Sequence, residues 1–157
     1  RSTLFPYTTL FRAIDCGRNT SLAFRVLGAP WLRAESFCAE LAKRRLAGVA
    51  LHPYRYVAAV APHAGRELDG VRLTVVDPAR FRPAQASLAI LQTMAELYGP
   101  ARVWRHKGVR PGWFDKLYGT DRARLQLKAG APLAPLFSDW ARDRRAFGKS
   151  RAKALLY

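Results

Sequence analysis

The feature of this chain that most constrains its fold is the order of its periodic segments. Two stretches, 49–56 and 71–76, have strand-like composition, and the second alternates most clearly. The segments with helical spacing or helix-start signals are 34–47, 83–98, 113–118, 120–128 and 133–147. Apolar alternation is typical of strands, whereas repeats of three to four residues are typical of helices. The order therefore predicts an α+β fold in which a small mixed sheet packs with several helices.

The first twelve residues differ in character from the rest. Thr3–Arg12 reads as the translation of a common short-read sequencing adaptor, and Arg1–Ser2 matches the end of the same adaptor. We therefore expect residues 1–12 to be an artefact, to be set aside in fold reasoning, and residues 13–157 to form one domain. The alternative is a native N-terminal strand, because this stretch is rich in aromatic and aliphatic residues.

The charge of the chain favours anionic partners. The net charge is +16, with 21 Arg against 6 Lys, while half of the residues are hydrophobic. Such a chain folds, and its partners can be nucleic acid, acidic lipid or carboxylate-bearing substrates. A genome rich in G and C is the simpler explanation of the arginine content, so the charge alone is a weak signal. No apolar run approaches the roughly 20 residues of a membrane-spanning helix, so we expect no membrane span. Localisation stays open.

The sequence contains few groups that could carry out catalysis. The three histidines lie far apart without a motif, and no spacing of histidines, cysteines or carboxylates suggests a metal or cofactor site. A glycosidase needs two carboxylates, or one and a substitute, across the scissile bond. Asp15 is the best placed carboxylate, beside a glycine–arginine loop. We therefore expect no catalytic residue, no metal and no cofactor in this chain.

A basic stretch interrupted by aromatic residues raises a second class of function. Trp104–Arg110 alternates aromatic and cationic groups, as proteins that bind single-stranded nucleic acid do. One such stretch without a nucleic-acid module more often forms a solvated loop. We therefore do not expect a nucleic-acid partner, and a non-enzymatic basic module for acidic glycans or nucleic acid stays as the alternative function.

An ordered set of short motifs covers almost the whole chain from about Ile14. The set is Gly17-Arg18-Asn19-Thr20, Phe24, Gly28-Ala29-Pro30-Trp31-Leu32, Gly48-Val49, Gly70-Val71, Phe81-x-Pro83, Phe114-Asp115-x-Leu117-x-Gly119, Phe147, Arg151 and Leu155-Leu156-Tyr157. In this order the motifs resemble the exo-β-N-acetylmuramidase family. Three positions depart from the family pattern: Asn19 replaces a glycine, Ala23 a proline and Arg25 a glutamate. Asn19 can still adopt a left-handed backbone conformation.

The resemblance implies a two-domain glycoside hydrolase. Enzymes of this family release N-acetylmuramic acid from the non-reducing ends of peptidoglycan fragments during cell-wall turnover. A Rossmann-like N-terminal domain is expected to hold the catalytic carboxylate, and residues 13–157 would be the C-terminal domain. The acidic stretch that the family places before Gly17 would fall at Leu10–Ala13, where it is missing. The partners implied are muramyl saccharides and the missing N-terminal domain, and the fragment is expected to be inactive alone.

The same resemblance points to the substrate-binding residues. A guanidinium donates two parallel hydrogen bonds to a carboxylate such as the lactyl group of muramic acid, which makes Arg18 the first candidate. Asn19 and Thr20 could add neutral hydrogen bonds, and Asp15 lies beside them. The alternative is that Arg18 pairs with Asp15 or with an interdomain carboxylate. A sugar could stack on Tyr54, Tyr56 or Trp104. Core positions are expected for Trp31, Tyr98 and Trp140.

Overall fold

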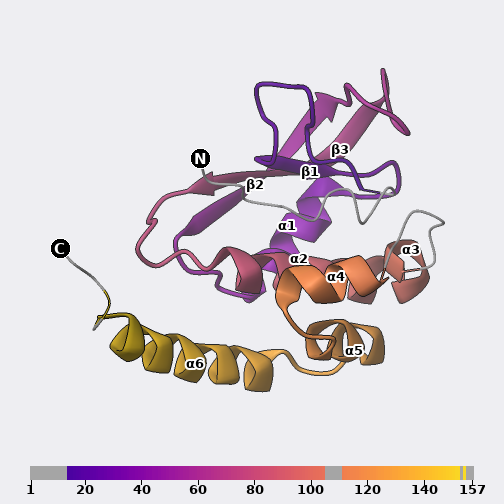
Figure 1. The fold of residues 1–157 in the computed structure, drawn as a ribbon. Coiled ribbons are helices and arrows are strands. Elements are labelled where there is room, and N and C mark those ends of the chain that lie inside the picture. The colour runs from indigo at the N-terminus through magenta and orange to yellow at the C-terminus, as the bar shows by residue number, and fades with distance from the viewer. Residues whose placement is uncertain (1–13, 105–110, 153, 155–157) are drawn as a thin grey trace.

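A computed structural model describes residues 14–104, 111–152 and 154 of the chain (Figure 1). Its strands are β1 (Val26–Gly28), β2 (Val49–Val57) and β3 (Glu67–Val75). Its helices are α1 (Ala34–Lys43), α2 (Pro83–Tyr98), α3 (Pro100–Trp104), α4 (Pro111–Tyr118), α5 (Arg122–Ala129) and α6 (Ala134–Ala152). None of the described helices is both long enough and apolar enough to cross a membrane.

The three strands form one antiparallel sheet in the order β1–β3–β2. Leu51 of β2 pairs with Leu73 of β3, and Gly28 of β1 pairs with Gly70 of β3. The predicted α+β class is confirmed, but the sheet is antiparallel where we expected a mixed one. The reason is that β2 and β3 are joined by a short connection, which returns the chain in the opposite direction.

One face of the sheet packs on α1 and α2, which lie beneath it in Figure 1. Because side chains of a strand alternate between faces, β3 places Val71 and Leu73 on this side. They join Leu27 of β1, Phe37 of α1 and Leu88 of α2, all of them buried. The apolar alternation that predicted the second strand therefore marks the core face.

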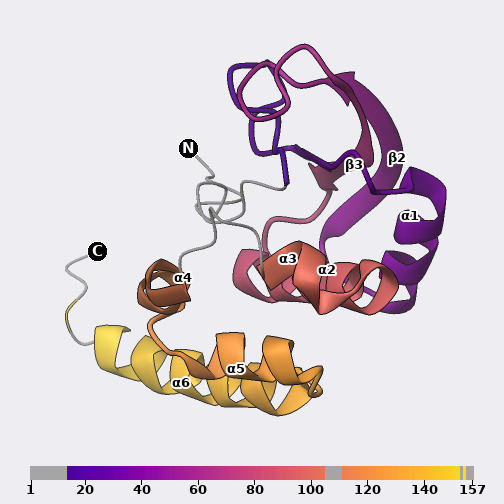
Figure 2. The ribbon, with the colours of Figure 1, turned by 90° about the vertical axis from the view of Figure 1, so that its right-hand side faces the viewer.

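A second layer of helices lies on the far side of α2. Both views place α5 and α6 below α2, away from the sheet (Figures 1 and 2). Phe114 of α4, Leu127 of α5 and Leu136 of α6 are buried in the same hydrophobic core. From Arg142 to Ala152, every residue of α6 is exposed. The core therefore holds only the first part of this long helix.

Several predicted boundaries were displaced. Helix α2 spans the predicted residues, but α1 ends at Lys43 instead of residue 47, because Arg45 adopts a left-handed φ of 49°. Strand β3 begins at Glu67, four residues early, where pairing with β2 overrides the low strand propensity of Asp69 and Gly70. Strand β1 was not predicted. Trp104, the first residue of the basic stretch, ends α3, and Pro111, directly after that stretch, begins α4.

Candidate functional site

The candidate site lies where the chain from Asp15 to Arg25 meets the sheet. Asp15 forms a two-way backbone bridge with Gly28 at the end of β1. Its carboxylate is almost completely buried, with 1% of the residue exposed. Oδ1 accepts hydrogen bonds from the Gly17 amide at 2.7 Å and from the Tyr56 hydroxyl at 2.9 Å. Oδ2 is buried and has no hydrogen-bond partner among the described residues.

Two paired glycines make room for the contact between Tyr56 and Asp15. A Cβ at Gly28 would lie 2.9 Å from Cε1 of Tyr56, and a Cβ at Gly70 would lie 2.2 Å from the carbonyl oxygen of Leu27. Any side chain at Gly28 would therefore displace the Tyr56 ring. Burial raises the pKa of Tyr56, and the adjacent charge and hydrogen bond of Asp15 raise it further. Tyr56 is therefore held as a neutral hydrogen-bond donor.

The loop that follows Asp15 is fixed by its own backbone and side chains. Gly17 and Asn19 both have left-handed φ angles, 68° and 59°, which explains the need for glycine or asparagine at these positions. The Thr20 hydroxyl donates to the Gly17 carbonyl at 2.7 Å and accepts from the Leu22 amide at 3.1 Å. The hydroxyl of Thr20 thus stabilises the loop, whereas Asn19 is exposed.

Arg18 extends from this loop toward the connection between β2 and β3. Its Nη2 donates to the carbonyl oxygen of Ala61 at 3.4 Å, and its Nε is buried without a hydrogen-bond partner among the described residues. Nε2 of His63, in the same connection, is also buried without a hydrogen-bond partner among the described residues. No ion pair joins Arg18 to any of the eleven acidic residues, all of which the structure describes. The alternative pairing of Arg18 with Asp15 is therefore wrong.

The aromatic residues predicted near a sugar are separated by the fold. Tyr54 and Tyr56 project from the same face of β2, with ring centroids 6.4 Å apart and an interplanar angle of 23°. Trp104 instead packs edge-on against Phe114, at 5.4 Å, among the helices. The core positions expected for Trp31, Tyr98 and Trp140 are confirmed, because all three are partly buried against the core.

Other predictions fall on residues that the structure does not describe. These are the adaptor-like residues 1–12, the stretch at 10–13 where an acidic residue was expected, the basic residues 105–110 and the C-terminal motif 155–157. No group of three or more histidine, cysteine or acidic side chains that could hold a metal ion occurs among the described residues.

A polar cavity of about 330 Å³ lies on the opposite face of the sheet from Tyr56 and holds two carboxylates. Its lining includes Arg55, Arg66, Glu67 and Asp69. Arg55 Nε lies 3.3 Å from Glu67 Oε1 and 2.8 Å from Asp69 Oδ1. Both carboxylates thus form ion pairs with one arginine, an arrangement unlike an acid and a base facing each other across a glycosidic bond.

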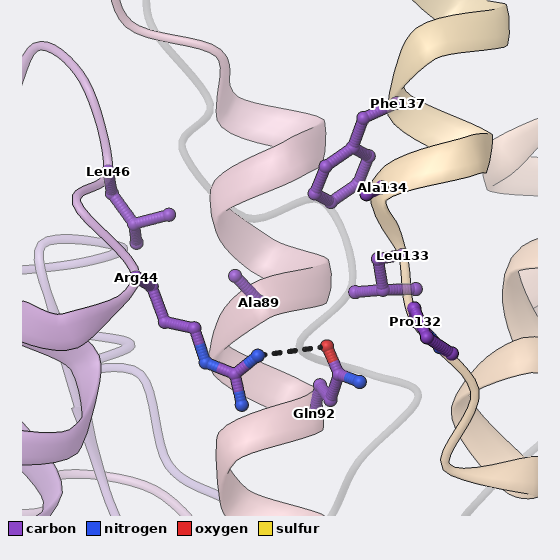
Figure 3. A pocket seen from close by; sticks show the side chains of 8 residues that line it. All are labelled: Arg44, Leu46, Ala89, Gln92, Pro132, Leu133, Ala134 and Phe137. Carbon is purple, nitrogen blue, oxygen red and sulfur yellow. Dashed lines mark hydrogen bonds between the residues drawn. The ribbon is translucent and has the colours of Figure 1, made fainter.

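A second cavity, of about 280 Å³, lies between α1, α2 and the start of α6. Figure 3 shows Arg44 from the end of α1 and Gln92 from α2 on one side, with Leu133 and Phe137 on the other. Arg44 Nη1 donates to Gln92 Oε1 at 3.3 Å, and its Nη2 donates to Glu96. Gln92 Nε2 donates to the Ala131 carbonyl at 3.2 Å. The polar groups around this cavity satisfy one another, which is typical of a structural junction.

The sequence missed two features of the site. The first is the Gly28–Gly70 pair, whose members lie 42 residues apart and meet only through sheet pairing. The second is the hydrogen bond between Tyr56 and Asp15. Gly28 was recognised only as part of a motif. The signal that could have indicated the glycine pair is glycine itself, which in a strand often marks the close approach of another group.

Comparison with known proteins gives three matches. Residues 3–157 match the family model described as exo-beta-N-acetylmuramidase NamZ, C-terminal. The chain is 26% identical over 156 residues to the peptidoglycan beta-N-acetylmuramidase NamZ of Bacillus subtilis strain 168, covering 98% of this chain and 37% of that protein.

The third match is a solved structure. A DUF1343 family protein from Bacteroides fragilis has the same fold, with a TM-score of 0.85 and 22% identity over 99% of this chain and 41% of that one. The present chain thus spans well under half of both relatives. Because the family model matches nearly every residue, the resemblance found in the sequence is confirmed, and the chain belongs to the family of the C-terminal domain of exo-β-N-acetylmuramidase NamZ.

Proposed function

We propose that this chain is the substrate-binding C-terminal part of a glycoside hydrolase that releases N-acetylmuramic acid from the non-reducing ends of peptidoglycan fragments. The observation that carries the proposal is the position of Arg18. It extends from a loop fixed by Gly17, Asn19 and Thr20, and no acidic residue neutralises it. A cation held in this way is suited to bind an anionic ligand.

The chemistry of the sugar fits this cation. N-acetylmuramic acid differs from other amino sugars of the cell wall in its lactyl carboxylate. A guanidinium can bind such a group through two parallel charge-assisted hydrogen bonds, a geometry that an ammonium group lacks. Asn19 is exposed beside Arg18 and can donate or accept a neutral hydrogen bond. We assign Arg18 and Asn19 to the substrate, and Asp15, Thr20 and Tyr56 to holding the loop.

The hydrolytic step itself is assigned to another part of a longer protein. Hydrolysis of a glycoside uses two groups on either side of the bond, in most families two carboxylates. Asp15 is buried, and Glu67 and Asp69 are ion-paired with Arg55. The chain matches only 37% of the Bacillus subtilis relative, which leaves room for a catalytic domain. We therefore propose that the 157-residue chain is inactive alone.

A chimera tests the proposal. Residues 14–157 replace the matching region of the Bacillus subtilis relative, and release of N-acetylmuramic acid from an aryl β-glycoside is followed. The chimera is expected to release the sugar, whereas the chain alone releases none. An aryl glycoside of N-acetylglucosamine, which lacks the lactyl carboxylate, is the matched substrate control. A folded chimera that hydrolyses neither glycoside, or both equally, would contradict the proposal.

One observation favours the alternative of a basic binding module. The exposed part of α6 presents a set of cations: Arg142, Arg144, Arg145, Lys149 and Arg151. Binding of a DNA duplex or a sulfated glycan with a steep salt dependence, and without preference for muramyl sugars, would favour this module. Part of this charge is already neutralised, since Arg142 pairs with Asp139 at 3.0 Å.

A further inference from the structure

The face of the sheet that points away from the helices has a distinctive set of side chains. The pairing register places His52, Tyr54 and Tyr56 of β2 on this face together with Arg72 of β3. At the Tyr56 end, Asp15 and its loop cover the face through the hydrogen bond described above. At the other end His52 and Arg72 are exposed, and the neighbouring Tyr54 is half-buried. An open strip thus continues directly from the candidate site.

Arg72 on this strip is held without being neutralised. Its guanidinium carbon lies 5.6 Å from the centroid of the Tyr54 ring, a cation–π contact that fixes the side chain over the sheet. The guanidinium of Arg72 forms no ion pair and no hydrogen bond in the part of the chain that the structure describes. Arg55 lies three residues along β2 from His52, the partner of Arg72, and therefore on the opposite face, where it pairs with Glu67 and Asp69. The contrast shows that the sheet neutralises one arginine and leaves the other available.

Tyr54, the aromatic partner of Arg72, gives the strip a ring on which a sugar can lie. Tyr54 lies between Arg72 on one side and Tyr56 on the other, where the ring centroids are 6.4 Å apart. A tyrosine ring combines an apolar body with a polar hydroxyl, which suits the mixed apolar and polar surface of a sugar. His52 lies directly opposite Arg72, and its imidazole ring adds a hydrogen-bonding group to the strip. Neither β2 nor β3 places an acidic residue on this face.

We propose that this open strip is a second saccharide subsite, in which Arg72 and His52 bind the carboxylate of an acidic sugar and Tyr54 contacts its ring. One cation beside an aromatic ring fits a single carboxylate on a sugar better than a polyanion, which would require a row of cations. The identity of the acidic sugar as a muramyl residue rests on the proposed function. The strip is separate from Arg18, which extends toward the β2–β3 connection.

The 157-residue chain itself can be used for the test. Its backbone amide resonances are followed by NMR while N-acetylmuramic acid is added, with N-acetylglucosamine as the matched ligand without the lactyl carboxylate. We expect shifts at His52, Tyr54 and Arg72 with the first sugar and much weaker shifts with the second. Arg72→Ala is expected to weaken this binding roughly tenfold or more, since it removes a charge-assisted contact.

Matched variants separate the contacts. Arg144→Ala removes an exposed arginine of α6 and is expected to leave the affinity unchanged. Tyr54→Phe keeps the ring and is expected to retain binding, whereas Tyr54→Ala should lose most of it. Thermal unfolding of each variant checks that the fold persists. We expect it to persist in Arg72→Ala, because Arg72 is exposed. No shifts at the strip, equal binding of both sugars, or stronger binding of a DNA oligonucleotide would each overturn the proposal.

The result can be told apart from that of the proposed function. If the chimera releases N-acetylmuramic acid and Arg72→Ala changes neither its KM nor the NMR shifts, the subsite is wrong while the function stands. If the chimera is inactive but the chain binds the acidic sugar through Arg72, the subsite stands as a lectin-like site. Arg18→Ala is expected to leave the shifts at the strip in place.

Discussion

The hydroxyl of Tyr56 donates a 2.9 Å hydrogen bond to the buried Oδ1 of Asp15, across 41 residues of sequence. The same oxygen accepts the Gly17 amide at 2.7 Å. A carboxylate is tolerated in an almost fully buried position only when hydrogen bonds replace its lost hydration. Tyr56 therefore links the stability of the sheet to the conformation of the loop that presents Arg18.

Replacement of Tyr56 by phenylalanine should destabilise the fold. The variant Tyr56→Phe keeps the ring but leaves the buried Asp15 carboxylate with the Gly17 amide as its only described donor. We expect the free energy of unfolding, measured by urea denaturation, to fall by about 1–3 kcal/mol. Tyr54→Phe is the control, because no hydrogen bond to the Tyr54 hydroxyl occurs among the described residues. Equal effects of the two variants would contradict the importance of the Asp15 contact.

The raised pKa of Tyr56 predicts a loss of stability at alkaline pH. Burial, and then the charge of Asp15, raise this pKa above the value of 10.0 expected in the unfolded chain. Above pH 10 the unfolded chain releases the Tyr56 proton while the folded chain keeps it, so the free energy of unfolding falls as pH rises. The contribution of Tyr56 to the free energy of unfolding is fully present below pH 10. Above pH 10 it is lost at a rate of at most about 1.4 kcal/mol per pH unit.

The comparison with Tyr56→Phe isolates this contribution from other groups that titrate in the same range. Urea denaturation of the wild type between pH 9 and 11 should show a steeper decline than that of the variant. Parallel declines would show that Tyr56 titrates normally in the folded protein, and would therefore exclude the pKa shift.

The core could be predicted from the sequence because its signals are local. The alternation of Val71, Leu73 and Val75 and the apolar stripe of 83–98 each identified an element by its own periodicity. The site loop was located through its motif. The Asn19 left-handed conformation also followed from residue type. Each of these features depends on neighbours within a few residues.

The remaining features depend on pairing between distant segments. Strand β1 has only three residues and contains a glycine, so no alternation could reveal it. The position of Arg72 opposite His52 and beside Tyr54 depends on the pairing register of β2 and β3, which the sequence does not specify. The end of α1 was misplaced because Gly48 was a plausible stop signal, whereas the chain already turns at Arg45. Sequence patterns thus located the loop but not the strip beside it.

The glycine pair of the sheet should tolerate no side chain. A Cβ in Gly70→Ala would lie 2.2 Å from the backbone carbonyl oxygen of Leu27, and β1 cannot move without breaking its pairing. We expect a loss of roughly 1–3 kcal/mol in the free energy of unfolding, or more. Gly148→Ala in α6 is the matched control. Nothing lies within 4 Å of the Cβ position at Gly148, so this substitution should raise the free energy of unfolding by about 0.5–1 kcal/mol. Thermal denaturation of both variants measures the difference.

Replacement of Arg18 should affect activity more than stability. In the chimera, Arg18→Ala removes the proposed contact with the lactyl carboxylate, and we expect kcat/KM for the muramic acid glycoside to fall roughly 10- to 100-fold. Arg18→Lys restores the charge but not the two parallel donors, so it should recover only part of the loss. Arg25→Ala, an exposed residue of the same loop, is the control. A loss of activity explained wholly by unfolding would assign Arg18 a structural role.

The junction in Figure 3 predicts a stability effect far from the sugar site. Gln92 is 6% exposed and connects Arg44 to the Ala131 carbonyl before α6. Gln92→Leu preserves the volume but leaves that carbonyl without its amide donor, so the free energy of unfolding should fall by about 1–3 kcal/mol. Gln85→Leu lies on the same helix, and its side chain makes no hydrogen bond among the described residues, so it should change the free energy of unfolding by less than about 0.5 kcal/mol. Because Arg44 and Gln92 share one hydrogen bond, the effects of Arg44→Ala and Gln92→Leu should not add in the double variant. Strict additivity would show that the two side chains contribute independently.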